Sequence, residues 1–292
     1  MNRKLLIVIL ALVCGITSQG MTVEWKDSVL SITSIVSDRG DTLHYEFKKC
    51  MSNRLFTFSR VELNGKVVNE ATSDNIGPFL LENQAWAGGN HLMPDGETPS
   101  AHTISVQLSI NKDKHPITDG YQGEANIVNV TVQNDIINPL VKNELFCKET
   151  INYTISLNVI EVDARHDYCN EQPITVSRYY GLQSMACGET EIRTLDGKYS
   201  QFTPVAQVDR FMKKEYPHFQ TFVEKMPAGY QVTELYPYAL GTHYAVENND
   251  VVFIGNSYGK CYHKLMGNYP VQKGMTTYWK GAYLWISNYV IE

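Results

Sequence analysis

Apolar and polar residues alternate with a period of two through most of this chain. In residues 151–159, every odd-numbered residue is apolar and every even-numbered residue is polar. This pattern is typical of an antiparallel strand with one buried face and one solvated face. Further strands are predicted over Thr42–Lys48, Arg60–Val67, Ile104–Ile110, Asn126–Val132, Ile174–Tyr180, Thr190–Thr194, Val232–Tyr236, Tyr244–Glu247, Val251–Ile254 and Thr277–Tyr289.

The residues between these segments favour tight turns. Asn64-Gly65, Asp119-Gly120 and Asp196-Gly197 are hairpin dipeptides, because Asn and Asp tolerate positive φ and Gly adopts it readily. Helical spacing is convincing only in Val208–Lys225, where Pro217 predicts a break or a kink. The sequence therefore predicts a mostly β protein with little helix, a large antiparallel β-sandwich of the supersandwich type formed by residues 21–292 as a single domain.

The first 20 residues have the pattern of a signal peptide. Arg3 and Lys4 precede the apolar run Leu5–Val13, and small residues precede a cleavage site after Gly20. The run is shorter than the roughly 20 residues that span a bilayer. The chain is therefore expected to be secreted or periplasmic and to have no transmembrane segment. Lipid anchoring through Cys14 is the alternative.

Charge and cysteine content exclude several classes of function. Cleavage after residue 20 changes the formal net charge from −6 to −8, and an acidic chain without a basic stripe does not suit nucleic acid. The five remaining cysteines form no CxxC pair, so no zinc site is expected. Two interpretations of these cysteines remain: a disulfide between Cys169 and Cys187, or buried reduced thiols. The sequence has no HExxH motif, calcium loop or phosphate-binding loop, so no metal or other cofactor is expected.

The segment 86–103 is rich in glycine and proline and carries candidate binding residues. An indole ring can stack on the C–H face of a sugar, while imidazole, amide and carboxylate groups hydrogen-bond its hydroxyls. The same residues also suit a purely structural loop, because Gly88-Gly89 and Pro94-Asp95-Gly96 are turn sequences. The candidates in this segment are Trp86, Asn90, His91, Asp95 and His102.

A second group of candidates lies at the end of the strand predicted over Ile174–Tyr180. Alternation places Arg178 and Tyr180 on one face, and Tyr179 and Gln183 on the other. An arginine can pair with the carboxylate of an acidic sugar, and a tyrosine beside a cation can act as an acid or a base. A tyrosine-rich strand with a solvated arginine is the structural alternative.

Two further patterns have structural and functional interpretations. Glu149 and Glu161 lie in phase with the buried face of 151–159, and an inward carboxylate is either paired, part of a site or at a wet strand end. Near the C-terminus, alternation places four aromatic residues on one face, which favours a core strand over a carbohydrate platform. These are Trp279, Tyr283, Trp285 and Tyr289.

The Trp86-Ala-Gly-Gly-Asn-His91 loop, at one third of a long-stranded chain with an export signal, resembles the galactose-mutarotase-like supersandwich proteins. The resemblance covers residues 22–290 in architecture and, locally, the loop 86–103 and the strand 173–185. It implies that a sugar lies across a concave sheet approached by the Gly/His-rich loop. The His base and Glu pair of the aldose epimerases do not align with this chain. Related proteins include polysaccharide lyases that use Tyr, His and Arg.

These observations lead to the hypothesis of an exported carbohydrate-active protein that binds an oligo- or polysaccharide on a concave sheet. If it is an enzyme, of lyase or epimerase type, the most concrete reaction is elimination on an acidic glycan. Arg178 would neutralise the uronate, and His91 and Tyr180 would serve as base and acid. The alternatives are a non-catalytic glycan-binding or adhesion module and a structural envelope protein. The substrate-binding candidates are Trp86, Asn90, Asp95, His102 and Gln183.

Overall fold

The computed structural model describes residues 20–70, 74–111, 118–141, 143–185, 190–194, 199–207, 211–212, 221–236, 250–254 and 260–288. The predicted signal peptide up to residue 19, the predicted strand 244–247, Cys187 and Tyr289 lie outside these residues. Within the described part, no helix is long and apolar enough to cross a membrane.

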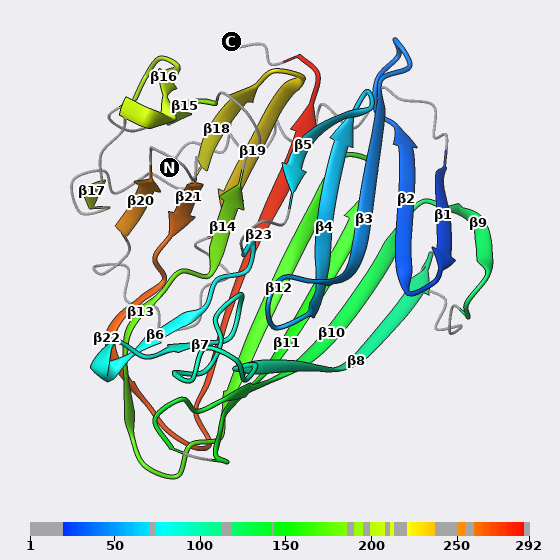
Figure 1. Cartoon of the computed structure of the whole chain (residues 1–292). Coiled ribbons are helices and arrows are strands. Elements are labelled where there is room, and N and C mark those ends of the chain that lie inside the picture. Colours follow the sequence, from blue (N-terminus) through cyan, green and yellow to red (C-terminus); the bar gives the residue numbers. More distant parts are fainter. Residues whose placement is uncertain are drawn as a thin grey trace.

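A six-stranded antiparallel sheet forms one layer (Figure 1). The strands over Met21–Lys26, Val29–Ile35 and Thr42–Cys50 alternate between buried and more exposed residues, as the period-two pattern predicts. Asn64-Gly65 forms a hairpin turn with φ of 53° and 72°. In spatial order the strands are β5 (Lys66–Glu70), β4 (Leu55–Leu63), β3 (Thr42–Cys50), β2 (Val29–Ile35), β1 (Met21–Lys26) and β9 (Tyr121–Ala125).

A nine-stranded antiparallel sheet forms the second layer, behind the first in Figure 1. Its spatial order is β16 (Thr203–Pro204), β15 (Glu191–Thr194), β18 (Thr221–Met226), β19 (Gly229–Leu235), β23 (Thr276–Ile286), β12 (Val159–Tyr168), β11 (Leu145–Ser156), β10 (Val128–Ile137) and β8 (Ala101–Ile110). The two layers confirm the predicted mostly β, sandwich-type fold class.

Two four-stranded sheets complete the described structure, together with the short 3-10 helices η1 (Glu82–Gln84) and η2 (Val205–Gln207). One sheet has the order β22 (Met266–Val271), β13 (Ile174–Tyr179), β6 (Phe79–Leu81) and β7 (Trp86–Ala87). The other has the order β14 (Leu182–Met185), β21 (Lys260–His263), β20 (Asp250–Ile254) and β17 (Phe211–Met212).

Aromatic side chains fill the core between the two large sheets. Phe58 of β4 packs edge-on against Tyr153, Tyr283 and Trp285, with ring centroids 5.2–6.2 Å apart. Such edge-to-face contacts add to the free energy gained by burying the rings. Trp279, like Tyr283 and Trp285, has no exposed surface, so the core interpretation is confirmed for these three C-terminal aromatic residues.

Some predictions of individual elements are wrong. Thr221–Met226 is strand β18, although the helix predicted over Val208–Lys225 includes most of it. The predicted strand 151–159 ends at Ser156 and turns at Leu157 (φ 48°). Residues 60–67 belong to two strands, β4 and β5.

The described cysteines are thiols. Cys50, Cys147, Cys169 and Cys261 are free, and Cys147 and Cys261 are buried as small apolar residues. Desolvation raises the pKa of Cys50 to about 11, which keeps this thiol protonated at neutral pH. The four described cysteines therefore agree with the prediction of reduced thiols.

Candidate functional site

A row of cross-strand partners brings the two groups of candidates onto one face of the β22–β13–β6–β7 sheet. Gly267 pairs with Arg178, Arg178 with Leu80, and Leu80 with Trp86. Directly paired residues point to the same side of a sheet. Arg178 and Trp86 therefore share a face although 92 residues separate them, and only Leu80 lies between them.

A β-bulge at Ser177 directs Arg178 outward. The register between β13 and β6 shifts between Val176 and Arg178, and both Val176 and Tyr179 are fully buried. In a regular strand, residues three apart point to opposite faces, so the extra residue is needed to bury both. As a result, Ser177 and Arg178 both face away from the core, and Arg178 is exposed.

We term a group of four rings the aromatic platform: Trp86, which belongs to this row, and His91, Tyr180 and Tyr262. Trp86 stacks on His91 with centroids 4.5 Å apart and an interplanar angle of 9°. Tyr180 stacks on Tyr262 at 4.7 Å and 24°, and Trp86 packs against this pair. Trp86 and His91 are half-buried, so part of their surface is open to solvent.

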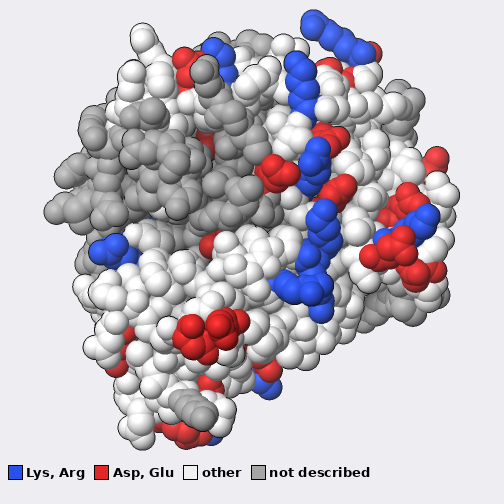
Figure 2. Space-filling view, viewed as in Figure 1, with Lys and Arg blue, Asp and Glu red and all other residues white. Residues whose placement is uncertain are grey.

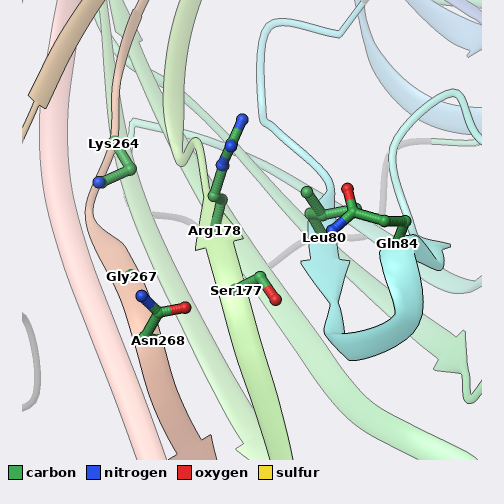
Figure 3. Close-up of a pocket in the computed structure, with 7 residues that line it drawn as sticks. All are labelled: Leu80, Gln84, Ser177, Arg178, Lys264, Gly267 and Asn268. Carbon is green, nitrogen blue, oxygen red and sulfur yellow. The ribbon is translucent and has the colours of Figure 1, made fainter.

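A groove of about 340 Å³ adjoins the platform, and we term it the Arg178 groove. Figure 3 shows Arg178 rising from β13 between the β22 side and the segment in which Leu80 of β6 is followed by Gln84 of η1. Because Gly267 has no side chain, the space opposite Arg178 on β22 stays open. The lining residues are Leu80, Gln84, Ser177, Arg178, Lys264, Gly267 and Asn268.

The polar residues of the 86–103 loop mainly fix its backbone. Asn90 Oδ1 accepts a hydrogen bond from the Ser52 N–H at 2.7 Å. Asp95 accepts hydrogen bonds from the Thr98 hydroxyl and from the N–H groups of Thr98 and Glu97, which hold the pKa of this carboxyl below its usual value. The interpretation of this segment as a structural loop thus describes the contacts that these two side chains make.

The remaining two candidates lie away from the platform surface. His102 is exposed on β8 opposite Asp135, on the solvated face of the nine-stranded sheet. Gln183 is 1% exposed, and its Nε2 donates to the Tyr180 carbonyl at 2.7 Å. Gly77 also holds this corner, because a Cβ there would lie 1.5 Å from the same carbonyl oxygen. Gln183 and Gly77 thus position Tyr180.

Glu149, predicted to point inward, is 4% exposed and belongs to a buried polar row across the nine-stranded sheet. Glu149 Oε2 lies 3.0 Å from His166 Nε2, and Oε1 accepts from Asn134 Nδ2 at 2.9 Å. The Tyr179 hydroxyl lies 3.4 Å from His166 Nε2. This row therefore supports the strand that carries Arg178 and Tyr180. Glu161, predicted to point inward as well, is exposed, and that prediction is wrong.

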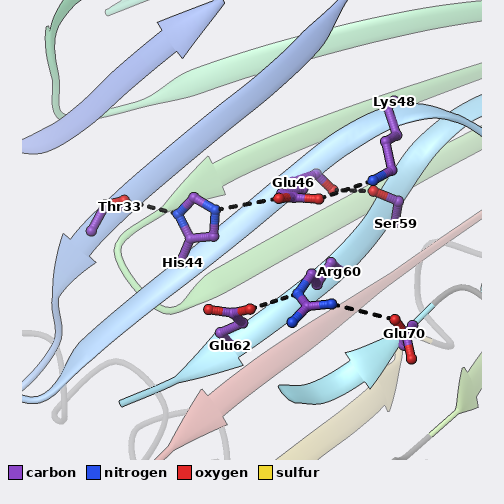
Figure 4. Close-up of polar contacts among 8 residues, drawn as sticks. All are labelled: Thr33, His44, Glu46, Lys48, Ser59, Arg60, Glu62 and Glu70. Atoms are coloured by element: carbon purple, nitrogen blue, oxygen red, sulfur yellow. Dashed lines mark hydrogen bonds and ion pairs between the residues drawn. The ribbon is translucent and has the colours of Figure 1, made fainter. Parts of the chain in front are cut away.

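A second groove, of about 440 Å³, crosses the outer face of the six-stranded sheet, where Figure 2 shows a band of mixed charge. Its charges pair with one another (Figure 4): Lys48 Nζ lies 3.1 Å from Glu46, and Arg60 contacts both Glu62 and Glu70. Such paired surface charges contribute little to stability, and because three glutamates face two cations, this groove presents no positive field to an anionic ligand. This face is a solvated surface.

Several residues of the site escaped the sequence analysis. Tyr262 lies in the short strand β21 and Lys264 follows that strand, while Gln84 ends the 3-10 helix η1 and Asn268 lies in β22, in segments with no distinctive motif. The one available signal was the alternation of Tyr262 and Lys264, which places both on one face. Among the described residues, no group of three or more His, Cys, Asp or Glu side chains could hold a metal ion.

No protein-family model matches the sequence, and no curated protein matches it. Solved structures do match the fold. The galactosidase domain of alpha-galactosidase-sucrose kinase, AgaSK, is 9% identical with a TM-score of 0.47, over 92% of this chain and 41% of that chain. A Glycoside Hydrolase Family 97 enzyme from Pseudoalteromonas sp. strain K8 is 12% identical with a TM-score of 0.45, over 90% of this chain and 35% of that chain.

Heparan sulfate lyase HepC from Pedobacter heparinus is 9% identical with a TM-score of 0.42, over 94% of this chain and 38% of that chain. This chain spans less than half the length of each of these three proteins. By their names, the three are carbohydrate-active enzymes, two of them hydrolases and one a lyase.

Proposed function

We propose that this chain is an exported carbohydrate-active protein of the galactose-mutarotase-like supersandwich type, and that it binds a glycan across the aromatic platform. The observation that carries the proposal is the register row that places Trp86 and Arg178 on one face. It joins a half-exposed indole to an exposed guanidinium across two strand spacings, about 10 Å. Sugar recognition needs this combination of a ring surface and directed polar groups.

The roles within the site follow from exposure and contacts. Trp86 and His91 present the open part of the platform, so we assign them to stacking on a sugar ring. Tyr180 is 7% exposed and stacks on Tyr262, so it backs Trp86 and presents little surface of its own. Arg178 offers up to five N–H donors to hydroxyl or carboxylate oxygens.

Replacing Trp86 by Ala is expected to weaken glycan binding about 10-fold or more, because the sugar loses its stacking surface. Titration calorimetry against a panel of neutral and acidic oligosaccharides measures this loss. Tyr278→Ala is the matched control, since Tyr278 is a 43% exposed aromatic residue on β23, away from the platform, and its loss should leave affinity unchanged. Equal affinities for wild type and Trp86→Ala would reject the site.

The same arrangement favours lyase-type elimination as a second candidate function. The His91 ring lies 4.5 Å from the Trp86 ring, and Arg178 lies on the same face two strands from Trp86, so elimination requires the Arg178 side chain to hold the uronate carboxylate toward His91 and not in the Arg178 groove. Arg178 would stabilise the developing charge on the carboxylate, and water would protonate the leaving oxygen, because Tyr180 is only 7% exposed.

His91→Ala is then expected to abolish formation of unsaturated products that absorb in the ultraviolet, with thermal unfolding close to that of wild type. The assay uses each acidic glycan that the wild-type protein binds. If the wild-type protein binds a uronate-containing glycan and releases no unsaturated product from it, the chain is a binding module and not a lyase.

A further inference from the structure

We infer that the Arg178 groove is a subsite for an anionic substituent of the glycan, either a sulfate ester or a uronate carboxylate. The inference rests on the proposed function, because the substituent would belong to a sugar on the adjoining platform. It adds two determinants that the sequence analysis did not identify, Lys264 as a second cation and Gly267 as the residue that leaves room for the anion.

The charge of the groove is the first argument. Arg178 and Lys264 line it together, and no Asp or Glu is among the seven lining residues. Arg178 is exposed and forms no ion pair within the described part of the chain. The groove on the six-stranded sheet differs, because three glutamates accompany its two cations there. An exposed Arg178 that forms no ion pair within the described residues, in a groove of about 340 Å³ that no described Asp or Glu lines, favours a negatively charged group.

The donors around the two cations suit a group with several oxygen atoms. Ser177 contributes a hydroxyl, because the β-bulge turns it outward together with Arg178. Gln84 and Asn268 contribute amide N–H groups from opposite sides of the groove. Sulfate and carboxylate oxygens accept charge-assisted hydrogen bonds from such donors, and a guanidinium can bind two of the oxygens at once.

The shape of the groove is the second argument. Gly267 is the cross-strand partner of Arg178 and lines the groove without adding a side chain to it. On the other side, Leu80 pairs with Arg178 and is 3% exposed, which gives the groove an apolar wall toward the platform. An anion in the groove therefore lies one strand from Leu80 and two strands from Trp86, within one continuous surface.

The test compares matched glycans on the full chain. A sulfated oligosaccharide is paired with its desulfated form, and an oligouronate is paired with its carboxyl-reduced form. Titration calorimetry gives the ratio of the two Kd values within each pair. Wild type is expected to prefer at least one anionic form about 10-fold or more, and this preference is expected to fall as salt rises.

Arg178→Gln and Lys264→Gln are each expected to reduce that preference at least about 5-fold. Arg165→Gln, which removes an exposed arginine paired with Asp167 on the nine-stranded sheet, should leave it unchanged. A preference confined to the sulfated pair identifies a sulfate subsite, and one confined to the oligouronate identifies a carboxylate subsite. Thermal unfolding of each variant verifies that it is folded.

These measurements distinguish a failure of the proposed glycan-binding function from a failure of the anionic subsite. If wild type binds neutral and anionic forms equally and Trp86→Ala weakens both, the platform stands and the anionic subsite is refuted. A preference that survives both Arg178→Gln and Lys264→Gln also refutes the subsite. If wild type binds no glycan of the panel, the proposed function fails and the subsite fails with it.

Discussion

Glu149→Ala is expected to lower the free energy of unfolding by about 3 kcal/mol, because it leaves buried hydrogen-bonding groups without their partner. His166 has no exposed surface, and the variant leaves its Nε2 without the carboxylate that lies 3.0 Å away. The Asn134 amide loses its acceptor as well. Urea denaturation followed by tryptophan fluorescence measures the loss.

Two other variants separate the buried pair from a general effect of losing a carboxylate. Glu149→Gln keeps an oxygen acceptor, so its expected loss is smaller than that of Glu149→Ala. Glu171→Ala removes an ion pair with Lys273 in which both side chains are more than 60% exposed, and the expected loss is below about 1 kcal/mol. A Glu149→Ala protein as stable as Glu171→Ala would show that the buried pair contributes no stability.

The same row connects the core to the candidate site. Trp279 Nε1 donates to the Tyr179 hydroxyl at 2.8 Å, and that hydroxyl also faces His166. Tyr179 lies between Arg178 and Tyr180, so its anchoring fixes both neighbours on the outer face. Glu149 therefore supports the site through the fold, without contacting a ligand.

Alternation predicted the strands well and their ends poorly. Residues 151–159 alternate through a two-residue turn at Leu157 and Asn158, where neither glycine nor proline marks the break. Ser156 pairs with Val159, so Ile155 opposes Ile160, and the inward residues change from odd to even numbers. This change of parity is the reason that Glu149 points inward and Glu161 points outward.

The predicted helix failed for a different physical reason. In β18, Phe222 and Val223 are both fully buried because the strand is covered on both faces. A strand of this kind has no alternation, and adjacent apolar residues then imitate helical spacing. Short apolar runs cannot distinguish the two structures without their tertiary neighbours.

The candidate site depended on contacts that no local pattern contains. Strand alternation correctly placed Arg178 and Tyr179 on opposite faces. Trp86 joins Arg178 only through Leu80 of β6, a three-residue strand too short to show a period. The bulge at Ser177 and the position of Lys264 likewise follow from pairing with β6 and β22, so they required the fold.

The carboxyl of Glu224 is expected to lower the free energy of unfolding by about 3 kcal/mol as pH rises from about 4.5 to about 8, and Glu224→Gln is expected to abolish this decrease. Glu224 has no exposed surface, and desolvation raises the pKa of its carboxyl to about 7, against hydrogen bonds from Ser184, Cys261 and Gln231 that oppose the rise. In the unfolded chain this carboxyl titrates near 4.5. The folded state therefore holds a proton that the unfolded state has released.

The sign of the effect follows from this difference in bound protons. Below about pH 4.5 the carboxyl is protonated in both states, and its contribution to stability is fully present. As pH rises, the unfolded state ionises first, so stability falls until the folded carboxyl ionises near pH 7. A Gln side chain does not ionise, so the variant does not lose stability in this way as pH rises. It keeps an acceptor for Gln231 Nε2, which donates to Glu224 at 2.8 Å.

Urea denaturation of wild type and variant at a series of pH values gives the difference in unfolding free energy between them, in which the other titrating groups cancel. That difference should shift by about 3 kcal/mol in favour of Glu224→Gln from the acid end to the alkaline end. A constant difference for Glu224→Gln would mean that the folded protein holds this carboxyl no more strongly protonated than the unfolded chain does, and that desolvation at β18 is offset by its hydrogen bonds.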